Sequence, residues 1–580
     1  MTHQASAGGG DPLDSKMLTE VVRLHGALQA APLPLDLPGV STLRTARDQI
    51  VEQLEDYIIP RLTELEAPLL VVVGGSTGAG KSTLVNTLVE GKVTTPGLLR
   101  PTTMSPVLVH HPEDAGWFGP ERLLPDLKRV SAPTTDPRSI ELVAHPNVPK
   151  GLAILDAPDV DSVEAANREL ATQLLAAADL WLFVTSAARY SDQVPWEHLK
   201  LAVDRNTPVA LVLSRTPALD VDTVSVHLAR MMAARGLKDS PLFSVAHGTV
   251  DDDGRLPASS TTEIRGWLEA LAADAAARRE IVNQTVAGAV RTVTRKAFPI
   301  ADAAALQVDA AADLLARADR VYDDAQTALL AEAGDGTLLR GDLLARWQEF
   351  VGSGELVRTL EAKVGFVRER LVNAIKGKPQ QAERVGVAIE MALETLVMDH
   401  ADRAATGAAE LWREREYGEA LLAETVDDLS RSGRALRRRT EQEVRAWHDE
   451  LQEFVKHEAG DARHSSRFLA IGVRGLAVTL AVVALGGPEP RGQAADSIRL
   501  GRGLLETVIG HAATTRVVDQ ARGTLARRLS TLLGEERARY LAPAAQWQLK
   551  PDAPDQLRQA ARRVDDLRFA AARKGTGGHL

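Results

Sequence analysis

The 580-residue sequence contains no cysteine, and only 4% of its residues are aromatic. Without cysteine the chain can form no disulfide, hold no cysteine-ligated zinc or iron–sulfur cluster, and use no thiol in catalysis. The scarcity of aromatic side chains argues against a large β-sandwich or barrel and favours helices. The sequence also has no charge-free apolar run of about eighteen residues, the length that would clearly span a membrane.

A basic excess is missing too, because the net charge is −10. We therefore expect no nucleic acid among the partners of this chain. The amino terminus does not show the charged-then-apolar pattern of a secretory signal, so we expect a cytoplasmic location. The apolar and charged fractions, 44% and 25%, are those of ordinary globular proteins.

Changes in hydrophobic pattern divide the chain into five segments. A helical pattern in Met17–Leu28 is followed by prolines, and Ser41 is the predicted N-cap of a second helix that ends near Leu65. The predicted segments are a disordered start (1–16), a helical lead-in that packs on one of the two larger regions (17–65), an α/β P-loop domain (66–275), an all-helical bundle or stalk (276–573) and a disordered tail (574–580).

Short apolar runs alternate with helical patterns between residues 66 and 275. This alternation predicts a mainly parallel, doubly wound sheet with helices on both faces. The predicted strands are Leu69–Val73, Val107–His110, Leu152–Leu155, Leu180–Val184, Val209–Leu213 and Pro241–Val245. Beyond this block no strand pattern is present, and long helices broken at Pro299 and at Gly334–Gly336 predict a bundle or an elongated stalk.

A phosphate-binding motif follows the first predicted strand and opens a predicted helix. The pattern G-x-x-x-x-G-K-S runs from Gly75 to Ser82, and such glycines let consecutive backbone N–H groups turn toward phosphate oxygens. Lys81 would reach the β- and γ-phosphates, and the Ser82 hydroxyl would ligate Mg²⁺. The predicted nucleotide-binding residues of this loop are Gly75, Ser76, Thr77, Gly78, Ala79, Gly80, Lys81, Ser82 and Thr83.

An acidic residue at the end of a neighbouring strand should hold magnesium in such a site. Asp156 directly follows the apolar run Leu152–Leu155, which is the position of a Walker-B aspartate. We therefore predict that Asp156 binds nucleotide-associated Mg²⁺, although an aspartate after a strand also often serves only as a helix cap.

Three successive elements resemble those of translation-factor-class GTPases: the P-loop, the run Arg100–Pro106 and the run Asp156–Ser162. With the helical lead-in and the helical second half, the chain resembles a bacterial dynamin-like GTPase, most closely the actinobacterial, Era-like members. The motifs cover about residues 65–275, and over the helical half the resemblance is architectural. It implies Mg²⁺-dependent GTP hydrolysis, self-association through the G domain, and coupling to membrane association or remodelling.

Carried over by position, the resemblance makes Thr103 the switch threonine that senses Mg²⁺ and the γ-phosphate, with Thr102 as the alternative. Lys81, Thr103, Asp156 and Thr77 would then be the residues at the reacting phosphate. The guanine-reading loop would contain Ser214 and Arg215, where Arg215 can stack on a purine as a lysine stem would.

Three departures from the family pattern affect these expectations. Thr77 and Gly78 stand where eukaryotic dynamins have a catalytic Gln-Ser, and Asp159 stands where the Asp-x-x-Gly motif has its glycine. A carboxylate there would repel the γ-phosphate, so we expect slow basal hydrolysis. The sequence Ser214-Arg-Thr-Pro217 lacks the aspartate of Asn-Lys-x-Asp, so the preference for GTP over ATP rests on the resemblance alone.

Residues 468–487 are the most apolar stretch of the chain and are interrupted by Arg474. One interpretation is a hairpin near residues 468–509 that enters a bilayer at the inner face of the cell membrane, with arginines on the headgroups. The other is a buried core helix, which fits a soluble regulatory GTPase, or an ATPase, whose helical half binds a protein. The arginine run Arg437–Arg439 has acidic neighbours, so we predict a solvated, salt-bridged helix there.

Overall fold

The computed structural model describes residues 12–94, 105–351, 378–460, 466–487 and 494–576, apart from Glu121, Thr135, Pro137 and Val163. Two compact units are present. The first comprises Met1–Leu33, Pro38–Leu306 and Lys550–Leu580, and the second comprises Pro34–Leu37 and Gln307–Leu549. Residues 276–306 and 550–573, expected in the helical half, therefore belong to the first unit.

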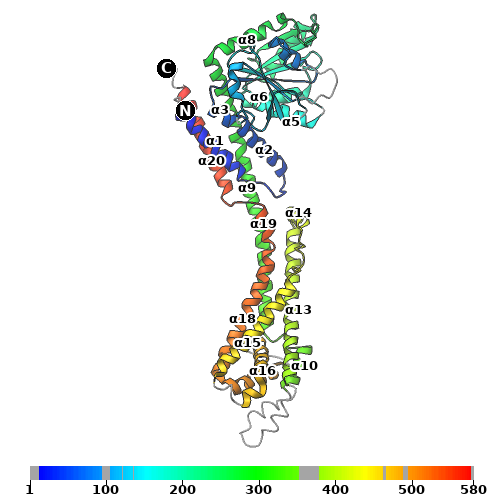
Figure 1. The fold of residues 1–580 in the computed structure, drawn as a ribbon, viewed down its shortest axis with the longest axis vertical. Coiled ribbons are helices and arrows are strands. Elements are labelled where there is room, and N and C mark those ends of the chain that lie inside the picture. Colours follow the sequence, from blue (N-terminus) through cyan, green and yellow to red (C-terminus); the bar gives the residue numbers. More distant parts are fainter. Residues whose placement is uncertain are drawn as a thin grey trace. The chain divides into compact units, whose positions relative to one another are not determined.

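One sheet forms the centre of the first unit (Figure 1). Within the described residues its strands follow the order β3-β4-β2-β5-β1-β6-β7-β8. Their bounds are β1 Leu69–Gly75, β2 Val107–His110, β3 Lys128–Val130, β4 Ser139–Ala144, β5 Leu152–Asp156, β6 Leu180–Ser186, β7 Val209–Thr216 and β8 Leu242–Ala246. From β5 to β8 all neighbours are parallel, whereas β2 pairs antiparallel with β5.

The predicted fold class is confirmed, because a mainly parallel sheet is followed by a long helical region. The sheet helices are α4 Lys81–Leu88, α5 Ala165–Ala176, α6 Gln193–Arg205, α7 Val221–Ala234 and α8 Thr262–Ala273, with the 3₁₀ turns η2 Pro112–Phe118 and η3 Ala258–Thr261. Two strands, β3 and β4, were not predicted. The strand β3 has three residues and no fully buried one, and β4 includes the polar Ser139 and Glu141, so neither forms an apolar run.

The amino-terminal helices belong to the sheet unit. Helix α1, Pro12–Gln29, packs along α20, Ala553–Thr576, which is seen in Figure 1 as a blue and a red helix side by side. The next helix is α2, Val40–Gln53, and it is followed by a π-helical turn, η1 Leu54–Ile58, and by α3 Ile59–Thr63. The prediction that Ser41 is an N-cap is wrong, because Gly39 takes the N-cap position with a φ of 77°.

A buried ion pair fastens this lead-in to the sheet. Arg61 of α3 and Asp179, just before β6, are both fully buried and paired. Asp179 also accepts hydrogen bonds from the Tyr57 hydroxyl at 2.9 Å and from the Leu70 amide at 2.7 Å. Because each partner of a buried charge pair is costly to leave alone, removal of either one destabilises this junction.

Helix α9 runs from Ala275 to Gly334 without interruption. The predicted break at Pro299 is therefore wrong, and the buried side chains of Ala297 and Ile300 on either side show that packing holds the helix through the proline. Gly288 lets α9 approach the end of α6 closely, since a Cβ there would lie 1.8 Å from the carbonyl oxygen of Arg205.

In the described residues of the second unit, all the regular secondary structure is helical. Besides the later part of α9, its helices are α10 Gly341–Val351, α13 Lys378–Arg413, α14 Glu416–Glu424, α15 Leu436–Ala459, α16 Ser466–Leu485, α17 Ala495–Ile509, α18 His511–Ala538 and α19 Leu541–Gln546. Three fully buried tryptophans, Trp347, Trp412 and Trp447, lie in its two apolar clusters. The Trp447 indole donates to the Ala521 carbonyl at 2.9 Å, which ties α15 to α18.

Helix α16 holds the apolar segment, and most of that segment is core. Leu476, Val478 and Val482 are at most 1% exposed and pack in the same cluster as α10, α13, α15, α17 and α18. Of the two interpretations of this segment, the buried core helix is therefore the one that holds for Leu476–Leu485 in this conformation. Only the start of the helix differs, where Leu469 is 70% exposed and Arg474 faces solvent. Among the described residues, no helix is both long and apolar enough to cross a membrane.

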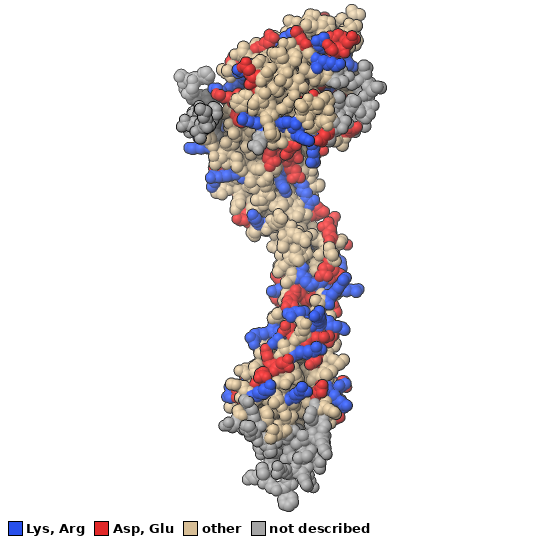
Figure 2. All heavy atoms as spheres, viewed as in Figure 1, with Lys and Arg blue, Asp and Glu red and all other residues tan. Residues whose placement is uncertain are grey.

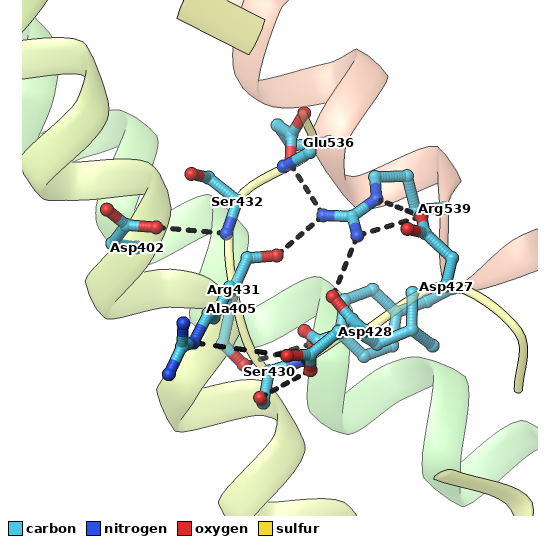
Figure 3. Close-up of polar contacts among 12 residues, drawn as sticks. Asp402, Ala405, Asp427, Asp428, Ser430, Arg431, Ser432, Glu536 and Arg539 are labelled. Atoms are coloured by element: carbon cyan, nitrogen blue, oxygen red, sulfur yellow. Dashed lines mark hydrogen bonds and ion pairs between the residues drawn. The ribbon is translucent and has the colours of Figure 1, made fainter. Parts of the chain in front are cut away.

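The loop between α14 and α15 is held by Arg539, which follows α18 (Figure 3). Its guanidinium donates to the carboxylates of Asp427 and Glu536 and to the carbonyl oxygens of Asp428 and Arg431, at 2.7–3.0 Å. The neighbouring Tyr540 hydroxyl donates to Ala405 and Leu429 carbonyls. Arg539 thus satisfies backbone groups of a segment that has no secondary structure of its own.

The arginine run at the start of α15 is salt-bridged, as predicted. Arg439 pairs with Glu535 at 2.8 Å and with Glu443 at 3.5 Å, and Arg437 pairs with Glu394 at 3.2 Å. Figure 2 shows blue and red side chains interleaved over the helical region. This run is therefore a solvated ionic surface of mixed sign.

The burial of α16 leads to a first prediction. Val478→Asp combined with Val482→Asp should unfold the second unit in the absence of any lipid, because two unpaired carboxylates enter an apolar core. We expect a loss of about 4 kcal/mol or more of stability, measured by circular dichroism melts. Leu469→Asp, at an exposed position of the same helix, is the matched control and should melt like the wild type. A double variant as stable as the control would contradict the core assignment.

Candidate functional site

The P-loop lies at the end of β1, between β5 and β6. Gly75, Gly78 and Gly80 have φ values of 142°, 75° and 93°, which side chains other than hydrogen rarely tolerate. At Gly75 a Cβ would also lie 2.0 Å from the carbonyl oxygen of Val184 in β6. The motif glycines are thus required by the backbone path as well as by any phosphate.

Lys81, the first residue of α4, folds back over this loop. Its ammonium donates to the carbonyl oxygens of Gly75 and Ser76 at 3.2 and 3.3 Å, and it forms an ion pair with Asp159. The side chain is 6% exposed. A nearly buried positive charge therefore sits at the centre of the loop, where an anion would be bound strongly.

Asp156 ends β5 and is paired in register with Val73 of β1. The pKa of its carboxyl group is raised to about 6, chiefly by burial and also by the charge of Asp159, against the opposing effects of the Ser82 hydroxyl and the Lys81 ammonium. Its Oδ1 atom is buried and has no hydrogen-bond partner among the residues that the structure describes. Carboxylate and hydroxyl oxygens are the ligands that Mg²⁺ prefers, so the unpartnered Oδ1 beside Ser82 fits a magnesium ion.

The loop after β5 supplies two more carboxylates, Asp159 and Asp161. Asp161 accepts from the Thr77 backbone N–H at 2.6 Å and from its hydroxyl at 2.5 Å through the same oxygen, Oδ1. Its other oxygen accepts from Arg189, which follows β6, at 2.7 Å. The sequence analysis named neither Asp161 nor Arg189. The spacing Asp156-x-x-Asp159-x-Asp161 is present in the sequence. Which hydrogen-bond donor each carboxylate binds depends on the tertiary structure.

Two other residues join the site from β7. The Ser214 hydroxyl donates to the Ala79 carbonyl of the P-loop, and Arg215 is exposed with a φ of 51°. A Cβ placed on Gly80 would lie 3.4 Å from Arg215 Nε, so this guanidinium lies against the P-loop. Pro217 and Asp220 are both exposed, and Asp220 is the N-cap residue of α7.

The predicted site residues that the structure describes are brought together. The loop Gly75–Thr83, Asp156, Ser214 and Arg215 converge at one edge of the sheet, whereas Thr102 and Thr103 lie outside the described residues. Thr94 was not predicted from the sequence. Its hydroxyl lowers the pKa of Asp156 by hydrogen bonding and also donates to the Ser82 carbonyl at 3.2 Å. Buried Asn86 holds Thr94 there by accepting its backbone N–H at 2.9 Å.

No family model and no curated protein matches this chain. Two solved structures of an oligomerised bacterial dynamin pair, described as a mechanism for long-range sensing and tethering of membranes, are similar over 97–98% of this chain and 96% of theirs. Their sequence identities are 10% and 11%, and their TM-scores 0.35 and 0.37. LeoA, a bacterial dynamin GTPase from ETEC, is 11% identical over 96% of this chain and 98% of its own, with a TM-score of 0.22. The architecture above rests on the sheet and helices of this chain.

The raised pKa of Asp156 gives a second prediction. An aspartate whose pKa is raised to about 6 in the folded state destabilises the fold increasingly from about pH 4, where the unfolded chain loses its proton, and fully above about pH 6. Asp156→Asn should therefore raise the stability of the ligand-free protein at pH 8 by about 3 kcal/mol at most, and should have almost no effect at about pH 3 and below.

Thermal melts across this pH range measure the effect. Asp192→Asn, which removes an exposed carboxylate whose one ion pair among the described residues is with Arg189, is the control and should show no such pH dependence. An Asp156→Asn variant that is less stable than wild type at pH 8 would mean that the carboxylate is satisfied in the folded protein.

Proposed function

We propose that this chain is a P-loop nucleoside triphosphatase that binds GTP with Mg²⁺ and hydrolyses it slowly. The observation that carries the proposal is the combination of a nearly buried Lys81 over the glycine loop with an unpartnered, buried Asp156 oxygen beside Ser82. The Lys81 ammonium can bind an anion and the Asp156 oxygen can bind a cation. A magnesium–triphosphate complex contains both.

Each residue would have a distinct part in binding and reaction. Lys81 and the loop N–H groups would neutralise the charge of the phosphates. The amino-terminal end of α4, where the helix dipole is positive, would add to this effect. Ser82 and Asp156 would hold the metal ion, which supplies charge neutralisation at the phosphates. Arg215 would lie on the face of the base. The proposal of GTP rather than ATP rests on the motif resemblance, because no base-reading aspartate is present in Ser214–Pro217.

We propose further that the chain works as a dynamin-like GTPase, through self-association of its nucleotide-binding unit and peripheral contact with membrane lipid. With most of α16 buried, lipid contact would use its exposed start, where Leu469 and Arg474 lie, and Arg499 of α17, which is 69% exposed. The alternative is a regulatory GTPase whose helical unit binds a protein, which the burial of Leu476–Leu485 favours.

The third prediction tests the phosphate site. Lys81→Ala should abolish detectable nucleotide binding, because the central positive charge of the loop is lost. Ser82→Ala should weaken only the part of the affinity that depends on magnesium. Titration calorimetry with GTP and ATP, with and without Mg²⁺, measures both effects, and Lys92→Ala, at an exposed lysine near the same helix, is the control. Wild-type affinity in Lys81→Ala would refute the P-loop assignment.

The fourth prediction separates the two cellular roles. Turnover per protein should be slow when dilute and should rise with protein concentration, because a neighbouring copy completes the site and excludes water. Anionic liposomes should raise it further and should pellet the protein, and Leu469→Asp should remove only the liposome effect. If the turnover rate rises with protein concentration but does not change when liposomes are added, membrane association is rejected and the protein-binding alternative is supported. A fast rate, independent of concentration, would contradict the self-association.

A further inference from the structure

The loop after β5 places two carboxylates on hydrogen-bond donors of the P-loop. The Lys81 ammonium is paired with Asp159, and the Thr77 N–H and hydroxyl are bound by Asp161. Both donors belong to the loop that, on the proposed function, receives the phosphates of a nucleotide. The loop therefore already holds anionic oxygens of its own.

The two carboxylates are not equally free to leave. Asp161 is 11% exposed and is also bound by Arg189, so its charge is balanced by a second cation. Asp159 is 33% exposed, and Lys81 is the only cation paired with it among the described residues. The backbone between them is fixed, because the buried Val160 donates its N–H to the Gly75 carbonyl. Asp161 is thus an anchor, and Asp159 is the carboxylate that can move.

A phosphate oxygen and the Asp159 carboxylate compete for the same charge. Lys81 is nearly buried, and its other partners are neutral carbonyl oxygens, so the ion pair with Asp159 supplies its charge balance. Two anions this close to one ammonium repel each other strongly where water is largely excluded. An entering phosphate must therefore displace Asp159, and the affinity is lowered by whatever the ion pair is worth.

We propose that Asp159 competes with the phosphates of the ligand for Lys81 and so lowers the affinity of the P-loop for every anion, which leaves only ligands with further contacts tightly bound. This inference rests on the proposed function for the identity of the ligand. A simple anion gains too little from Lys81 to displace the carboxylate. A magnesium–triphosphate complex also engages Ser82 and Asp156, and these added contacts offset the loss of the ion pair.

The test compares inorganic pyrophosphate, without metal, and Mg²⁺-GTP as ligands in titration calorimetry at low salt. Asp159→Asn keeps the shape of the side chain and removes its charge. It should bind both ligands at least about tenfold more tightly than the wild type, which corresponds to about 1.4 kcal/mol. The same variant should melt at a lower temperature without ligand, because Lys81 loses its charge partner.

Two variants serve as controls, and a third is a substitute for the test variant. Asp159→Glu keeps the carboxylate and should bind as weakly as the wild type, and Asp192→Asn removes a negative charge that does not touch the P-loop and should change nothing. Asp159→Gly replaces Asp159→Asn if the latter does not fold. Equal or weaker pyrophosphate binding by the folded uncharged variant would overturn the inference.

The outcomes also separate this inference from the proposed function. Tight pyrophosphate binding by Asp159→Asn, with no nucleotide binding by any variant, would support the competition and refute the nucleotide assignment. Nucleotide binding by the wild type that Asp159→Asn does not strengthen would refute the competition alone. No binding of either ligand by any variant would refute both.

Discussion

Four neighbouring strands, β5, β1, β6 and β7, run parallel, so their carboxyl ends lie at the same edge of the sheet. This constraint places Gly75, Asp156 and Ser214 together although they are far apart in the sequence. It also explains Gly75 itself, since the end of β1 passes so close to Val184 that only hydrogen fits. Every feature of the candidate site follows from chain segments that leave this edge.

The charges of the site do not fully satisfy one another. A nearly buried lysine requires an anion, and Asp159 provides one, while the same carboxylate raises the pKa of Asp156 and so opposes its ionisation. In the described part of the chain, the Oδ1 atom of Asp156 has no hydrogen-bond partner. A site whose charged groups lack full partners destabilises the fold. The same groups are then available to bind an ionic ligand strongly.

The helical unit shows how one pattern supports two interpretations until packing is known. An apolar helix such as α16 can face hydrocarbon or other helices, and both environments favour the same residues. Here α15, α17 and α18 cover Leu476–Leu485, and their own apolar faces are buried in return. The long-range contacts of Arg539 and Tyr540 with the loop before α15 likewise depend on chain segments more than a hundred residues away.

The sequence by itself determined the strand–loop–helix of the P-loop, six of the eight strands found in the described residues, the order of the two regions and the position of Asp156, because these depend on local pattern and short motifs. It could not determine that Asp159 and Asp161 bind P-loop donors, that α20 packs on α1, that α9 continues through Pro299, or that Leu476–Leu485 are core. Ion pairs, helix packing and burial join residues distant in the chain, so only the tertiary structure decides them.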